Sequence, residues 1–191
     1  MPTMISHAVV AFGAGALLPQ HKSFRFWACA VLASVIPDFD VLAFKFGIPY
    51  AHPFGHRGYF HSLSFALIWG IFTVLVFFRP AQHPRRQRVF LALFFFALTA
   101  CHDLLDAMTN GGLGIALLAP FSNERIFFPF APIQVSPIGL RGFLSERGLQ
   151  VLASEAIWVW VPTAVFVSLG IGLKVLLARR GRTVVSVGKP Q

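Results

Sequence analysis

Three ionisable side chains end a long apolar stretch of the sequence, in the segment His102-Asp103-Leu104-Leu105-Asp106. A helix brings His102 and Asp106 to one face a single turn apart, so their imidazole and carboxylate can bind one divalent cation. Ionisable groups at membrane depth are costly and are by default functional and paired, and Asp103 in the same motif is a further candidate. The alternative is a His–Asp hydrogen bond that only joins two helices.

Two carboxylates follow a short apolar stretch in the segment Ile36-Pro37-Asp38-Phe39-Asp40. Because side chains two residues apart can share or bridge hard or borderline cations, Asp38 and Asp40 are candidate catalytic residues. Either can bridge two metals or accept the proton of a metal-bound water. The alternative is the end of a helix followed by a solvated Asx turn.

Three imidazoles lie within ten residues, at His52, His56 and His61, where the next long apolar stretch begins. This density is typical of a metal site more than of packing, and the spacing leaves open which of the three is a ligand. Arg57 in the same loop can hold a phosphate through two hydrogen bonds, and Ser62 is a candidate substrate contact.

His7 and Glu155 begin the first and the last apolar stretches and complete the candidate metal ligands. Each also has a simpler interpretation. A glutamate at a helix start is often only a favourable partner of the helix dipole, and a lone histidine there is ambiguous.

The composition indicates which elements must position these residues. Of the 191 residues, 56% are hydrophobic and only 12% are charged, and the mean hydropathy is +0.70. Since soluble domains carry about 25% charged residues, we expect an integral membrane protein. In a soluble protein a net charge of +9 would suggest nucleic acid, but here the basic residues flank apolar stretches, so no nucleic-acid partner is expected. Cys29 and Cys101 lie in apolar runs and are expected to pack.

The apolar stretches predict an all-α, polytopic bundle of about five helices in the lipid bilayer. A span needs about 20 apolar residues, so we expect three full spans and a short N-terminal helical pair that tilts or re-enters, with Pro37 ending its second helix. No basic region precedes the first stretch, so we expect no cleaved signal peptide. The three expected full spans are 59–78, 89–108 and 155–178, and the two short helices are 5–18 and 24–36. The membrane domain is expected to cover 1–178, including an outer loop at 109–154, and a basic tail follows at 179–191.

The charges predict the orientation in the membrane. Basic residues crowd three places, which by the positive-inside tendency are cytoplasmic, together with the C-terminus. These residues are Lys22 and Arg25; Arg79, Arg85, Arg86 and Arg88; and Arg179, Arg180, Arg182 and Lys189. All the acidic residues then fall at or near the opposite, outer side. The histidines were not used in this argument, yet the orientation gathers the candidate ligands at that side, which predicts a shared site.

Oxygen and nitrogen ligands without cysteine suit zinc, and also manganese or iron. The candidates exceed the four ligands of one closed site, so we expect one or two divalent ions, with zinc favoured. The loop 109–154 is interpreted as substrate apparatus, with Asn110 and Arg125 as substrate contacts and the aromatic segment 121–130 admitting an acyl chain at the interface. The alternative is a lid that packs on the bundle.

At these residues the sequence resembles a known family. The order of His7, PDFD, HRGYFHS and HDLLDAMTNGG is similar to that of bacterial inner-membrane proteins of the YdjM type, which are described as predicted membrane-bound metal-dependent hydrolases. The resemblance covers about residues 1–160 and implies that fold and activity.

A more distant similarity is to zinc-dependent phospholipase C and related single-strand nucleases. It implies metal ligands at a set of positions from five parts of the chain, namely His7, Asp38, His61, His102, Asp106 and Glu155. The chain departs from that pattern, because no histidine lies four residues before Glu155 and the first residue lies six before His7. One or two ions are therefore expected, not three.

The function predicted from these observations is metal-assisted hydrolysis of an ester or phosphoester in a lipid-like substrate. A metal-bound water supplies the hydroxide, and the metal with Arg57 stabilises the developing oxyanion. The alternative is a cation or proton-coupled transporter that uses the same His/Asp cluster, although the chain has no evident internal repeat. A third hypothesis is a scaffold whose basic loop 79–88 binds an acidic partner.

Overall fold

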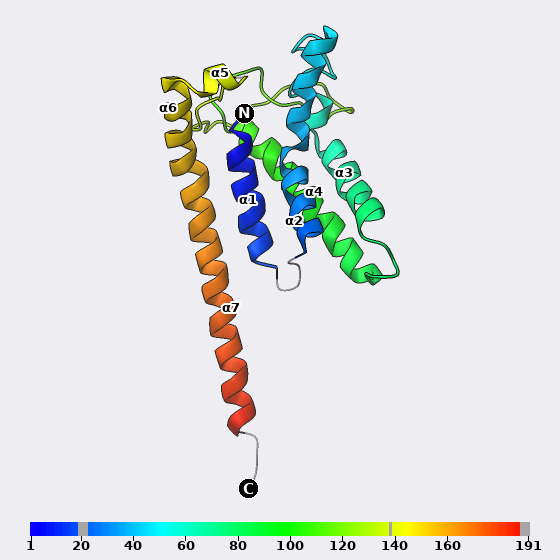
Figure 1. Ribbon diagram of the computed structural model, residues 1–191, viewed down its shortest axis with the longest axis vertical. Helices are drawn as coiled ribbons and strands as arrows, with labels where there is room; N and C mark the ends of the chain where they lie inside the picture. Colours follow the sequence, from blue (N-terminus) through cyan, green and yellow to red (C-terminus); the bar gives the residue numbers. More distant parts are fainter. Residues whose placement is uncertain (19–22, 138, 188–191) are drawn as a thin grey trace.

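The structure is a computed structural model that describes residues 1–18, 23–137 and 139–187, with the side chains of residue 140 and of residues 179–187 left aside. Lys22 and Lys189, which were used to predict the orientation, lie outside the described residues. The described residues form helices joined by loops, with two isolated β-bridges. Figure 1 shows α1, α2, α3 and α4 side by side, with α7 extending beyond them at one end.

The helices occur in the following order along the chain: α1 (Met4–Ala16), α2 (Phe24–Val35), the 3₁₀ helices η1 (Ile36–Phe46) and η2 (Tyr59–His61), α3 (Leu63–Phe77), α4 (Arg85–Ala107), α5 (Leu140–Phe143), α6 (Glu146–Glu155), the π-helix η3 (Ala156–Trp160) and α7 (Val161–Val187). This confirms the predicted all-helical bundle.

Three helical segments are long and apolar enough to cross a membrane, namely Phe24–Phe46, Arg85–Ala107 and Glu146–Ala178. Two shorter apolar helices, α1 and α3, accompany them. The number of spans agrees with the prediction, but one of the three is a different segment. The stretch 59–78 was predicted to span and 24–36 to be short, and the structure reverses these two assignments.

Local hydrogen bonding explains the reversal. Ser62 is the N-cap of α3 and its Oγ accepts a hydrogen bond from the Phe65 amide, so α3 starts only at residue 63 and is 15 residues long. Pro37 does end the α-helical geometry of α2, but at the first turn of η1 it has no intrahelical partner to lose. The chain therefore continues helically to Phe46.

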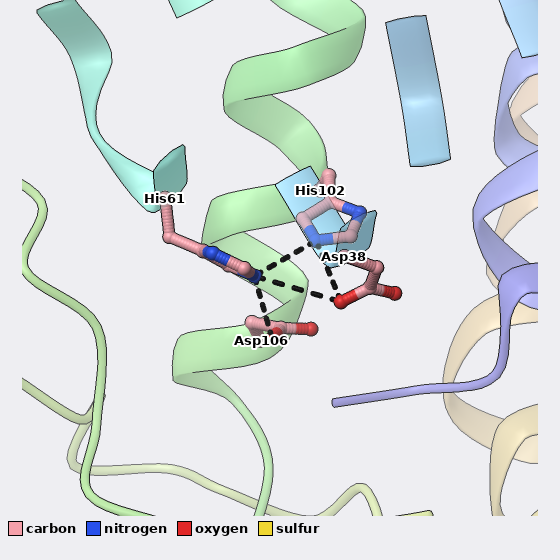
Figure 2. Close-up of side chains that lie close together, drawn as sticks. All are labelled: Asp38, His61, His102 and Asp106. Atoms are coloured by element: carbon pink, nitrogen blue, oxygen red, sulfur yellow. Dashed lines mark hydrogen bonds and ion pairs between the residues drawn. The ribbon is translucent and has the colours of Figure 1, made fainter. Parts of the chain in front are cut away.

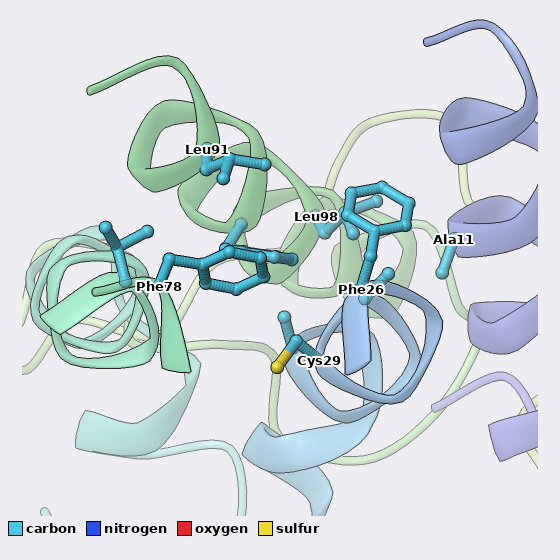
Figure 3. Packing of buried hydrophobic residues seen from close by; sticks show 10 residues of the cluster. Ala11, Phe26, Cys29, Phe78, Leu91 and Leu98 are labelled. Carbon is cyan, nitrogen blue, oxygen red and sulfur yellow. The ribbon is translucent and has the colours of Figure 1, made fainter. Parts of the chain in front are cut away.

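Apolar side chains from α1, α2, α3 and α4 fill the core (Figure 3). Phe26 and Leu91 are fully buried there, and Cys29 packs among them as predicted. Cys29 and Cys101 are both free. A close approach of α3 to α4 depends on Gly70, where a Cβ would lie 2.6 Å from the Ala92 carbonyl oxygen.

The long connection after α4 folds over one end of the bundle (Figure 1). The Phe128 amide donates to the Ala107 carbonyl, and β-bridges join Thr109 to Ile133 and Ile115 to Ile126. At the opposite end, the Arg25 guanidinium donates to the Phe77 carbonyl. The end of α4 that carries the His102 motif is therefore the covered end of the bundle.

Candidate metal centre

Four of the predicted site residues converge at this covered end (Figure 2). Asp38 comes from η1, His61 from η2, and His102 and Asp106 from successive turns of α4. Each offers a nitrogen or oxygen atom within 4.8 Å of the others, and all four side chains are buried. Segments far apart in the sequence thus deliver two imidazoles and two carboxylates to one point.

The spacing of the donor atoms fits a small cation. His61 Nε2 lies 3.2 Å from His102 Nε2, 3.6 Å from Asp38 Oδ1 and 3.5 Å from Asp106 Oδ2. His102 Nε2 lies 3.5 Å from Asp38 Oδ1. Four ligands held about 2.0–2.2 Å from a central ion, as around zinc, lie about 3.3–3.6 Å from one another in a tetrahedron.

The cluster also contains buried carboxylate oxygens without hydrogen bonds, which favours a bound cation. Both carboxylate oxygens of Asp38 and both of Asp106 are buried and accept no hydrogen bond from the described residues. Asp106 has an ion-pair partner in Arg57, whose Nε lies 3.2 Å from its Oδ2, but buried carboxylate oxygens without hydrogen bonds are unfavourable, and a bound cation compensates their charge. The residues present therefore fit a divalent metal.

Outer groups orient the two histidines. His102 Nδ1 donates to the Ser34 carbonyl at 2.8 Å, which leaves Nε2 free to face the cluster. His61 Nδ1 lies 3.0 Å from Asp40 Oδ2. Ligating histidines are usually held through their second nitrogen in this way. Asp40 thus lies behind His61 and not in the group of four.

Asp40 is itself fixed by two donors. The His56 imidazole donates to Oδ1 at 2.6 Å and the Arg57 amide donates to Oδ2 at 2.9 Å. His56, Asp40 and His61 form a second group with metal-ligand spacing, which shares His61 with the first. Burial opposes the protonated form of His61, but the carboxylates of Asp40, Asp106 and Asp38 outweigh it and raise the pKa of His61 well above its usual value.

Arg57 is fully buried, with a φ of 62°, beside the cluster. Its Nε lies 3.2 Å from Asp106 Oδ2, and its terminal nitrogens donate to the Gly111 carbonyl at 2.8 Å and to Thr109 Oγ1 at 2.9 Å. The guanidinium therefore supports Asp106 and the turn after α4. Its predicted contact with a substrate phosphate stays a prediction.

His7 borders the cluster on the other side of Asp106. Its Nε2 lies 3.6 Å from Asp106 Oδ1, and its ring stacks on that of His102 with 3.8 Å between the ring centroids. Neither nitrogen of His7 has a hydrogen-bond partner among the described residues. Since Asp106 turns one oxygen to His61 and the other to His7, it is placed to bridge two ions.

The structure does not bring Glu155 into either metal-ligand group. Its carboxylate accepts hydrogen bonds from the amide and hydroxyl of Thr3 and from the hydroxyl of Ser6, which also accepts one from the Trp160 indole. Glu155 thereby anchors the start of α1 to the end of α6. Its role as a metal ligand stays a prediction.

The predicted substrate contacts have partners within the chain. Ser62 caps α3, Asn110 Oδ1 accepts from the Val135 amide, and Arg125 donates to backbone carbonyls of the loop before His61. Asp103 is fully buried, and neither of its oxygens accepts a hydrogen bond from the described residues.

Sequence reasoning missed the supports of these residues. The Ser34 carbonyl orients His102 through its backbone, which leaves no side-chain signal. Thr3 and Ser6, which hold Glu155, lie just before and inside α1, and polar residues at the start of an apolar helix were the available signal.

Fold and site together define a class of protein: an all-helical membrane protein with a buried His/Asp cluster able to bind a metal ion. Residues 1–180 match the family model described as YdjM inner membrane protein, and the chain belongs to this family. Inner membrane protein YbcI of Escherichia coli (strain K12) is 38% identical over 167 residues, which cover 85% of this chain and 92% of that protein. No solved structure matches the chain.

These matches confirm the resemblance to the YdjM type and the expected inner-membrane class. The distant similarity to zinc-dependent phospholipase C finds no support among them.

Proposed function

We propose that this protein is a membrane-bound, metal-dependent hydrolase that cleaves an ester or phosphoester bond of a lipid-like substrate. The observation that carries the proposal is the convergence of four buried donors from Asp38, His61, His102 and Asp106, all within 4.8 Å of one another, with four of the distances between them at 3.2–3.6 Å. Zinc held by these four donors would have to take the attacking water as a fifth ligand; it would then lower the pKa of that water from 15.7 towards about 7 and so supply hydroxide at neutral pH.

The depth of the cluster supports a lipid substrate. His102 lies 17 residues after Arg85, where α4 begins, so at 1.5 Å per residue the cluster is about 26 Å along the helix. The hydrocarbon core is about 30 Å thick, so this position is near its boundary with the headgroups. Lipid ester and phosphate linkages lie at that level.

Three residues of the site have different proposed roles in the reaction. Asp38 has an oxygen without a hydrogen-bond partner and is the proposed acceptor of the proton from the attacking water. Asp40 orients His61. Arg57 holds Asp106 and supplies fixed positive charge, which favours negative charge developing on the substrate.

We further propose that the cluster faces the periplasm and that the C-terminus is cytoplasmic. At the opposite end of the bundle, Arg79 lies in the connection from α3 to α4, and Arg85, Arg86 and Arg88 lie in the first turn of α4. The positive-inside tendency places such a connection in the cytoplasm.

The apolar interior favours a hydrolase over the transporter alternative. Transport of a cation would need polar groups along a route through the bundle. Between the cluster and the arginine-rich end, the described core is filled by apolar side chains such as Phe26, Phe78 and Leu91. Among the described residues, the buried acidic, histidine and arginine side chains are therefore confined to the end of the bundle that holds the cluster.

Metal analysis of purified variants tests the proposal. We expect His102→Ala and Asp106→Ala to lose bound zinc and hydrolysis of a phospholipid, while His83→Ala, at the other end of the bundle, keeps both. Unchanged zinc content in both cluster variants would refute the metal site. Zinc binding with no turnover, together with uptake of zinc into liposomes, would favour the transporter.

A further inference from the structure

A groove of about 390 Å³ lies between α1, α4 and the segment formed by η3 and α7. Its walls are apolar apart from Thr163 and the indole of Trp158. Residues that line it from the three sides include Val10 and Ala14, Leu98, Cys101 and Leu105, and Phe166.

One end of the groove reaches the level of the metal centre along α4. Leu105 lines the groove and is the residue next to Asp106 on α4. His7, Val10 and Ala14 share one face of α1, because they lie three and four residues apart. The two helices that form walls of the groove thus carry His7 and Asp106 at the level where it ends, although neither residue lines it.

From this end the groove runs along the membrane spans. The lining residues of α4 extend from Leu105 back to Phe94, which is about 16 Å at 1.5 Å per residue. Both α4 and α7 belong to segments apolar enough to span the membrane. The groove therefore points from the boundary of the bilayer towards its middle.

We infer that this groove binds one hydrocarbon chain of a membrane lipid and holds the lipid's headgroup linkage at the metal centre. The groove lies within the spans, so hydrocarbon surrounds its open side, and its apolar walls offer no partner to a polar ligand. At about 30 Å³ for a group the size of water, it takes on the order of a dozen methylene groups. The catalytic meaning of this binding rests on the proposed function.

We place His7 between the lipid's hydrocarbon chain and its headgroup. It is buried above Val10, and neither ring nitrogen has a hydrogen-bond partner among the described residues. A lipid seated with its chain along Val10 and Ala14 brings its polar linkage to His7 and Asp106. The groove thus selects substrates that have a long chain directly attached to the scissile group.

Photo-crosslinking in nanodiscs tests the inference. The probe is phosphatidylglycerol with a diazirine near the end of one acyl chain, and crosslinked residues are mapped by mass spectrometry. We expect labelling of residues 94–105 at least several-fold above labelling of the exposed side chains of α3, which are Leu67, Ile68, Ile71, Phe72 and Leu75. Ala97→Trp, which fills the groove, and the milder Ala97→Leu should lower that labelling in order of size. Ala28→Trp, the same exchange at an exposed position of α2, should leave it unchanged.

Even labelling of both segments, or labelling unaffected by Ala97→Trp, would overturn the groove assignment. Zinc content of each variant separates this failure from failure of the proposed function, because Ala97 lies outside the metal-ligand group. Loss of turnover in Ala97→Trp for a long-chain phospholipid but not for its short-chain analogue supports the inference. Selective labelling without turnover of either lipid supports the groove and refutes the hydrolase.

Discussion

Replacing Asp40 by asparagine tests how the metal centre is supported. The Asp40 carboxylate receives the His56 imidazole and the Arg57 amide and lies 3.0 Å from His61 Nδ1. An asparagine keeps the shape, but one of its two terminal groups becomes an NH₂ that faces an N–H donor. His61 then loses a charged partner, although its Nε2 remains available to a metal.

The expected loss follows from this geometry. Removing an outer partner of a ligating histidine typically weakens metal binding about 10–100-fold. This corresponds to about 1.4–2.7 kcal/mol. Because Asp40 is not one of the four clustered ligands, the number of zinc ions bound at saturation should not change.

The assay titrates zinc into metal-free protein in detergent against a chromophoric chelator, with Glu124→Gln as the control for loss of an exposed carboxylate at the same end. We expect Asp40→Asn to lower the affinity at unchanged stoichiometry. A lower stoichiometry would mean that Asp40 binds a second ion with His56 and His61. An unchanged affinity would refute its role as the support of His61.

Three further predictions test other parts of the structure. Glu155→Gln should destabilise the protein by about 1.5–3 kcal/mol in thermal unfolding, because a hydrogen-bonded charge is lost. The variant should still bind zinc, and loss of zinc would show that Glu155 is a ligand. Gly70→Ala should lower the free energy of unfolding by about 1–3 kcal/mol, because the new Cβ would meet the Ala92 carbonyl. Gly172→Ala is the control, since a Cβ there has open space and should not lower the melting temperature. Equal effects of the two substitutions would contradict the close packing of α3 on α4. Zinc affinity should rise with pH and level off only above the usual pKa of histidine. The pKa of His61 is raised, so zinc has to displace the proton of the His61 imidazole in order to bind. A zinc affinity that is independent of pH would contradict this.

The four clustered ligands could be predicted from the sequence because ionisable residues are rare in it. His102 and Asp106 lie one helical turn apart in an apolar stretch, and helix direction follows from hydropathy and charge alone. These two facts were enough to bring Asp38 and the three histidines at 52, 56 and 61 to the same end of the bundle, but the spacing left open which of the three is a ligand, and the structure places His61 in the cluster.

The remaining features depend on tertiary contacts that hydropathy does not encode. Whether α2 stops at Pro37 or continues as η1 is decided by local packing, since proline is tolerated at a helix start. The sequence predicts Glu155 as a ligand, and in the structure both of its carboxylate oxygens accept hydrogen bonds from Thr3 at the start of α1. The groove exists only because α7 packs on α1 and leaves space beside α4.

The central claim is that Asp38, His61, His102 and Asp106 bind one metal ion together. X-ray absorption at the zinc edge of the purified, metal-loaded protein measures this most directly. The account predicts five nitrogen and oxygen neighbours at about 2.0–2.2 Å, namely the four protein donors, two of them imidazoles, and a water, and it predicts loss of this signal in His102→Ala. A shell containing sulfur, or an identical spectrum in His102→Ala, would contradict it.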